Sequence, residues 1–358
     1  MTLTMMLLTA VALTQSPLVV PVMIEDPLVD GPGLELRVDS VTQEVVMRAG
    51  PFHVASTTMA PADEMMAHTH DASALTPVMR IDWPVEGWMR GFSLRLKEPD
   101  GAELPSALIH HFVALNYERR QLVYPVIERL FAVGQETADV LLPPIVGVPL
   151  DEGQGLGFYA MWSNTLGRDL TVFIELRVPY LSTTQEPQFQ VLPLYLDVNN
   201  QIGGTSTFDL EPGATEKSFE FEVAAAGRIL MVGGHLHDYG AWVRLEDAET
   251  GEVLIDVKGD LDEEGRIHGV ERKIIGFGNR GLHVRPGRKY RIVGRYDYPR
   301  SETLKDGAMA HMMGLFVPDD LSDFPELDRT ADIYHLDVTG LPQEELHVGE
   351  ASGGHLHH

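Results

Sequence analysis

Hydrophobic and polar residues alternate with a period of two along much of the chain. Examples are GFSLRLK, LTVFIELRVPY, KSFEFEV, EVLIDVKG and KYRIVGRYDY, and this alternation is typical of half-buried β-strands. Turn-forming sequences such as EPDG, EPGAT and RPGRK separate the segments at short intervals, and long amphipathic helical stretches are scarce. The pattern predicts an all-β chain built as sandwiches or barrels.

The length of 358 residues predicts two domains. The polar segment LSTTQEPQFQ at 181–190 follows one apolar strand and precedes the apolar run VLPLYLDV, so we place the boundary there. The predicted domains span 35–182 and 188–318. The remainder, 319–358, is acidic and ends in histidines, which predicts a loosely packed tail.

The first 22 residues contain an apolar run of signal-peptide length but no positively charged start. We expect export to a periplasmic or secreted location; a buried first strand or a wrongly chosen start codon is the alternative. No later segment approaches the roughly 20 apolar residues of a membrane helix, so no membrane insertion is expected. The net charge of -26 repels nucleic acid, which we exclude as a partner.

The chain has no cysteine but 15 histidines and 15 methionines, so any metal must be held by His, Met or carboxylate. His235 and His237, in GGHLHDYG, share one face of a predicted strand and form the natural start of a metal site. A bland pair of polar surface residues is the alternative. Asp238 and Tyr239 follow and could orient the imidazoles, or form a solvated turn.

A methionine-rich strand, DGAMAHMMGLFVP at 306–318, lies downstream. A period of two places Met309, His311 and Met313 on one face and Met312 on the other. Methionine is an ordinary core residue, but a thioether beside two imidazoles favours copper, particularly Cu(I), over zinc or magnesium.

Other histidines pair in the first domain. His110 and His111 are adjacent, so a regular strand would direct them to opposite faces, and both could bind one metal only at a strand end or bulge. One buried and one solvated histidine is the alternative. His68 and His70 lie in a loop-like segment and favour a solvated pair. The nearby run ERRQLVYPVIERL, predicted as a short helix or loop, could bind an anionic substrate or be a solvated face.

The order HH, HxH and a Met-bearing strand, spread over two β domains, resembles the copper type II, ascorbate-dependent monooxygenases, the family of peptidylglycine α-hydroxylating monooxygenase and dopamine β-monooxygenase. The resemblance covers 85–318 and is most specific in GWMRGF, LIHHFV and GGHLHDYG. It implies two antiparallel jelly-roll sandwiches facing each other across a solvent-filled cleft, with one copper on each.

The resemblance also implies the ligands. The copper that binds oxygen would be held by His235, His237 and Met309, with Met312 or Met313 as the alternative methionine. The electron-storing copper would be held by His110 and His111. Its third ligand is a histidine in the family, but GFYAMWSNTLGRD contains none.

The expected position of that third ligand falls on Met161, with Ser163 next, or else the first site is empty. The implied activity is hydroxylation of a C–H bond of an organic substrate, which the sequence does not identify, with O2 and a reductant such as ascorbate. The alternatives are a copper-binding or buffering protein with a single His2Met site, and a structural module without a metal.

Overall fold

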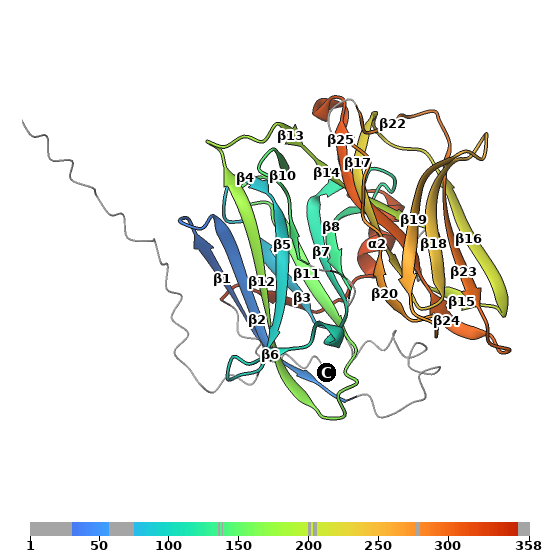
Figure 1. The fold of residues 1–358 in the computed structure, drawn as a ribbon. Helices are drawn as coiled ribbons and strands as arrows, with labels where there is room; N and C mark the ends of the chain where they lie inside the picture. The colour runs from blue at the N-terminus through green and yellow to red at the C-terminus, as the bar shows by residue number, and fades with distance from the viewer. Residues whose placement is uncertain are drawn as a thin grey trace, which may run out of the picture.

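The computed structural model describes residues 31–56, 75–134, 137, 139–199, 202, 206–276 and 280–349. The predicted signal segment 1–22 and the pair His68 and His70 lie outside the described residues. Within them nearly all regular structure is β, which confirms the predicted all-β class (Figure 1). No helix among the described residues is long and apolar enough to cross a membrane.

The first domain consists of two facing groups of strands. One contains β1 (Gly33–Asp39), β2 (Glu44–Val54), β12 (Leu170–Ser182) and β5 (Gly91–Lys97), extended by β4 (Gly87–Met89), β6 (Glu103–Leu104), β9 (Val140–Leu141), β10 (Val146–Leu150) and β13 (Phe189–Gln190). The other has the order β3 (Val78–Asp82), β11 (Gly155–Trp162), β7 (Ile109–Arg120) and β8 (Ile127–Val133), with a 3-10 turn, η2 (Ser106–Leu108), before β7.

The second domain repeats this plan. One sheet contains β14 (Leu192–Asp197), β25 (Ala310–Pro318), β17 (Gly227–Leu236), β21 (Lys273–Ile274) and β22 (Leu282–Val284). The other has the order β16 (Gly213–Phe221), β23 (Tyr290–Tyr298), β18 (Gly240–Asp247), β19 (Val253–Leu261) and β20 (Ile267–Val270), and β15 (Phe208–Leu210) pairs with β24 (Leu304–Ala308).

Strands distant in sequence are neighbours in both domains. In the first, β2 pairs with β12 and β3 with β11, while β7 and β8 form a hairpin. In the second, β14 pairs with β25 and β16 with β23, while β18 and β19 form a hairpin. Nested pairing of early with late strands is the connectivity of a jelly roll. The structure therefore has the two jelly-roll sandwiches that were predicted.

Alternation places one face of each strand in a core. In β12, Val172, Ile174 and Leu176 are buried in the core of the first domain, whereas the residues between them face outward. A separate cluster fills the second sandwich and includes Leu236 and Met312. The side chains of Met231 and Leu315, on strands of the second domain, pack against the core of the first domain. The β14–β25–β17 sheet therefore faces the first domain (Figure 1).

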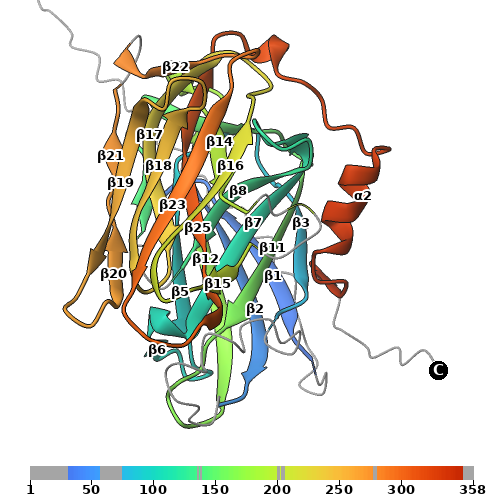
Figure 2. The same ribbon diagram turned by 90° about the vertical axis from the view of Figure 1, so that its right-hand side faces the viewer.

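Residues 319–349 form a docked segment, which we call the strap. It contains the turn η4 (Leu321–Asp323), the helix α2 (Asp332–Thr339) and β26 (Glu345–His347). β26 pairs in parallel with β3, and α2 lies against the flank of the first domain (Figure 2). Buried Leu341 and Leu346 and the Arg129–Asp337 ion pair fasten it. The prediction of a loosely packed tail is wrong for these residues, because an aspartate that looks solvated in the sequence meets a distant arginine.

Candidate metal centre

A β-bulge positions the adjacent histidines of the first domain. Between β7 and β11 the pairing passes from His111–Met161 to Ile109–Trp162, so His110 is an extra residue in the ladder. A bulge turns such a residue away from the alternating pattern, and here the His110 and His111 rings lie 4.3 Å apart between centroids. The sequence left open whether the two could approach one metal, and the bulge lets them do so.

A second pair of histidines faces them from the end of β17, where His235 lies in the strand and His237 directly follows it. Leu236 is buried in the core of the second domain, and His235 and His237 on either side of it point to the opposite face, as the period of two predicts. The imidazoles are 5.2 Å apart between ring centroids. His235 and His237 are 7% and 5% exposed, so they are not a solvated surface pair.

The two pairs meet at the interface between the domains. Ring centroids are 4.9 Å apart for His111 and His235 and 5.7 Å apart for His110 and His237. Ring nitrogens of His110, His111 and His237 lie within 4.8 Å of one another. The two histidine pairs are therefore not separated by a solvent-filled cleft but lie side by side, and the number of metals they bind stays a prediction. The facing sheets close around the histidines and leave one cluster.

The protonation states suit metal binding. Burial lowers the pKa of His111 and His237 well below the usual value, and neighbouring imidazoles add to the effect. His237 Nδ1 lies 3.2 Å from the Gly307 carbonyl oxygen, which can only accept a hydrogen bond. Nδ1 therefore carries the proton, and Nε2 of the neutral ring has its lone pair available. The buried Nε2 atoms of His111 and His237 have no hydrogen-bond partner in the described part of the chain.

A buried tyrosine fixes the second-domain side of the cluster. The Tyr296 hydroxyl accepts hydrogen bonds from the backbone N–H of His237 at 3.0 Å and of Met309 at 3.2 Å, and donates one to the Met309 carbonyl. This uses the full capacity of the hydroxyl. Tyr296 thus ties the end of the HxH segment to the start of β25. Nothing in the sequence marks this tyrosine.

The predicted methionines divide as the alternation of β25 requires. Met309 and Met313 line a cavity beside the histidines, whereas Met312 is fully buried in the second core and cannot reach them. Met161 is the cross-strand partner of His111, so both side chains project from the same face of the sheet. Met161 also lines the cavity, and its role as a ligand stays a prediction.

His311 belongs to the cluster as well, although the sequence gave it no role beyond sharing a face with Met309. It pairs across the sheet with His235 on one side and Asp197 on the other. Its Nε2 lies 3.2 Å from Asp197 Oδ2 and 3.3 Å from the Tyr195 hydroxyl. Asp238 and Tyr239 do not orient the imidazoles; Asp238 accepts a hydrogen bond from the Ile267 N–H instead.

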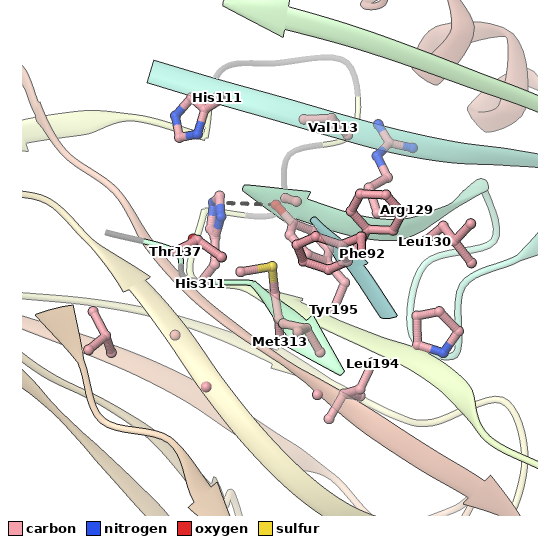
Figure 3. Close-up of a pocket in the computed structure, with 18 of the residues that line it drawn as sticks. Phe92, His111, Val113, Arg129, Leu130, Thr137, Leu194, Tyr195, His311 and Met313 are labelled. Carbon is pink, nitrogen blue, oxygen red and sulfur yellow. Dashed lines mark hydrogen bonds between the residues drawn. The ribbon is translucent and has the colours of Figure 1, made fainter. Parts of the chain in front are cut away.

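A cavity of about 410 Å³ opens beside the cluster, between the two domains. His111 and His311 stand at one end, and Phe92, Arg129 and Leu130 at the other (Figure 3). Gly340 and Pro342 of the strap complete the wall. The arrangement places a small-molecule chamber next to the histidine cluster.

No protein-family model and no curated protein matches the sequence. Among solved structures, the STIV MCP has a TM-score of 0.35 at 9% identity and covers 68% of this chain and 92% of its own. PNGF-II has a TM-score of 0.36 at 11% identity, with 69% of this chain and 60% of its own covered. The major capsid protein P2 from bacteriophage PM2 has a TM-score of 0.30 at 10% identity, with 68% and 94% covered. Similarities this weak carry no argument about function.

Proposed function

We propose that the chain holds copper at the histidine cluster and uses it, with O2 and an external reductant such as ascorbate, to hydroxylate a C–H bond of an organic substrate. One observation carries the proposal: the buried Nε2 atoms of His111 and His237 come from different domains, lie in one cluster and have no hydrogen-bond partner in the described part of the chain. Leaving such atoms unsatisfied is costly unless a ligand occupies them.

The imidazole and thioether groups around the cavity favour copper over hard metal ions. Imidazoles gather at one end of the cavity, and the thioethers of Met161, Met309 and Met313 line the same space. The chain has no cysteine. The nearby carboxylate, Asp197, is directed to His311, not to the other imidazoles. A nitrogen and thioether set selects Cu(I) and Cu(II) over Mg²⁺ or Ca²⁺.

Each domain contributes a part of the proposed centre. The bulge at His110 brings the first pair together, and the Gly307 carbonyl fixes the tautomer of His237. Bound copper would supply one-electron chemistry with O2. The surrounding protein keeps bulk water from the imidazoles, because His235 and His237 are almost completely buried, and offers the adjacent cavity to a substrate.

The test uses a chain shortened after Gly349, which keeps the strap and removes the histidines of the end that could bind copper adventitiously. The protein is loaded with Cu(I) and supplied with ¹⁸O2. Ascorbate-dependent O2 consumption is followed together with incorporation of ¹⁸O into small organic compounds. We expect labelled product, and its loss in His237→Ala. His268→Ala, which changes an exposed histidine bonded to Asp262, is the matched control and should keep activity.

Three outcomes would overturn parts of the proposal. Tight Cu(I) binding without labelled product would leave a copper-binding or buffering protein in place of the enzyme. Copper binding that His237→Ala does not reduce would remove the cluster as the site. Production of peroxide alone, with no labelled product, would also count against the hydroxylase.

A further inference from the structure

The interdomain cavity has the size and shelter of a small-molecule site. Its volume of about 410 Å³ falls in the roughly 300–1,000 Å³ range of ligand pockets. The first domain, the second domain and the strap all supply wall residues, so the cavity exists only when these parts are assembled. Its chemical character is decided by the charges and rings in that wall.

Aromatic and aliphatic groups form most of the wall on the side away from the histidines. The rings of Phe92 and Phe131 stack with centroids 4.1 Å apart and planes inclined by 12°. Leu130, Leu194 and Met231 extend the same surface. Flat apolar molecules pack well against a stacked aromatic pair.

Of the two arginines in this wall, Arg129 is already compensated. Arg129 donates two hydrogen bonds of 2.7 Å to the two carboxylate oxygens of Asp337 in the strap. The side chains are 10% and 3% exposed, and a third hydrogen bond from Arg129 reaches the Ile127 carbonyl at 2.9 Å. An incoming carboxylate would have to displace Asp337 from this bidentate pair. Arg272, on the side of the second domain, is the other arginine in the wall.

The phenols in the wall are neutral. Tyrosine hydroxyls carry no charge at neutral pH, and those of Tyr159 and Tyr195 belong to residues that line the wall. They can therefore donate or accept hydrogen bonds without adding a charge. The cavity thus joins a largely apolar surface with a few uncharged polar groups, the usual makeup of a site for a neutral ligand.

We propose that the cavity binds an uncharged, largely apolar molecule, flat aromatic or branched aliphatic, packed against Phe92 and Phe131 with its other end toward His111 and His311. The inference that this molecule is also the substrate of hydroxylation rests on the proposed function. The inference that the cavity binds it does not depend on that function. The idea from the sequence that the arginines near β8 bind an anionic substrate is thereby not favoured, because Arg129 is held by Asp337 and Arg119 by Glu128.

The experiment compares two nearly isosteric probes on the copper-free protein, so its result is independent of copper binding. The probes are 2-acetylnaphthalene, which is neutral, and 2-naphthoate, which is an anion, and binding is measured by isothermal titration calorimetry. We expect the ketone to bind with a Kd at least about tenfold lower, because the anion must be desolvated while the Arg129 guanidinium is already held by Asp337. Equal or tighter binding of naphthoate would overturn the proposal, and so would the absence of ketone binding.

A pair of glycine variants locates the bound probe. A Cβ added at Gly233, which lines the cavity, meets only the Arg272 side chain, at 3.6 Å. Gly233→Val should therefore narrow the cavity without disturbing the strand and raise the Kd of the ketone at least about tenfold. Gly33→Val, in β1, is the matched control, because a Cβ at Gly33 meets only the Gly50 carbonyl oxygen, at 3.9 Å. Equal effects of the two variants would place the probe elsewhere.

A third variant tests the charge argument directly. At a temperature where the variant stays folded, Asp337→Asn leaves the Arg129 guanidinium without its carboxylate beside the cavity, so affinity for 2-naphthoate should rise about tenfold while affinity for the ketone stays unchanged. A merely structural effect would weaken both probes. Unchanged naphthoate binding in Asp337→Asn would show that the Arg129–Asp337 pair does not set the selectivity. If the unmodified protein binds naphthoate and Arg272→Gln abolishes that binding, the cavity is an anion site instead.

Discussion

The ion pair between Arg129 and Asp337 fastens the strap to the first domain and should contribute strongly to stability. The partners are 208 residues apart in sequence, and their side chains are 10% and 3% exposed. Removing one member of such a pair leaves a buried charge without compensation. We therefore expect Asp337→Asn, which keeps the shape of the side chain, to lower the free energy of unfolding by about 3–5 kcal/mol.

Two comparison variants separate this effect from the mere loss of an aspartate. Asp139→Asn removes the partner of Arg95 in a pair whose side chains are 48% and 41% exposed, and it should cost less than about 1 kcal/mol. The double variant Arg129→Leu and Asp337→Leu removes both buried charges. It should recover most of the lost stability, because apolar replacement of a buried ion pair is often neutral or stabilising.

Thermal unfolding of the copper-free chain, followed by circular dichroism, is a suitable assay. For a domain of roughly 150 residues the expected loss corresponds to a fall in Tm of roughly 6–20 °C. A loss of stability in Asp337→Asn no larger than that in Asp139→Asn would contradict a stabilising role of the buried ion pair. A double leucine variant as unstable as Asp337→Asn would contradict the attribution of the loss to an uncompensated buried charge.

Three further predictions concern the cluster. Tyr296→Phe should weaken Cu(I) binding about 10–100-fold in a competition titration while the β circular dichroism spectrum is kept, because the hydroxyl positions His237 and Met309 through their backbones; unchanged affinity would contradict this. Met309→Leu should weaken Cu(I) binding, whereas Met312→Leu, which changes a core residue, should not. A larger loss of Cu(I) affinity in Met312→Leu than in Met309→Leu would exclude Met309 as a ligand. Because the pKa values of His111 and His237 lie well below 6.5 in the folded chain, the unfolded chain takes up protons that the folded chain does not. Copper-free stability should therefore be complete above about pH 7 and fall by up to about 1.4 kcal/mol per histidine per pH unit below 6.5; a stability independent of pH from 7 to 5.5 in urea titrations would contradict it.

The sequence predicts much of the architecture because alternation is a local property. A period of two is visible in β12 and β25, and it correctly separates Met309 and Met313 from Met312 and Leu236 from its flanking histidines. The run ERRQLVYPVIERL contains the predicted loop, at 121–126, but no helix, because its two ends belong to β7 and β8. Two strands joined by a turn resemble a helix when their apolar residues are close together.

The parts that the sequence does not predict depend on contacts between distant residues. Whether His110 and His111 share a face depends on one bulge, which is fixed by the pairing of β7 with β11. The meeting of His111 with His235 depends on the packing of two whole domains. The role of Tyr296 depends on a hydroxyl that reaches two separate backbone segments. No local pattern records any of these.

In the proposed function, both domains contribute ligands to one copper centre. The most direct test is a Cu(I) competition titration of the chain ending at Gly349 with His111→Ala, His237→Ala and the double variant. A shared centre predicts that each single variant weakens the same bound copper and that the double variant loses little more, since residues in one site act non-additively. Independent loss of one copper in each single variant, and of two in the double variant, would contradict the account and restore two separate sites.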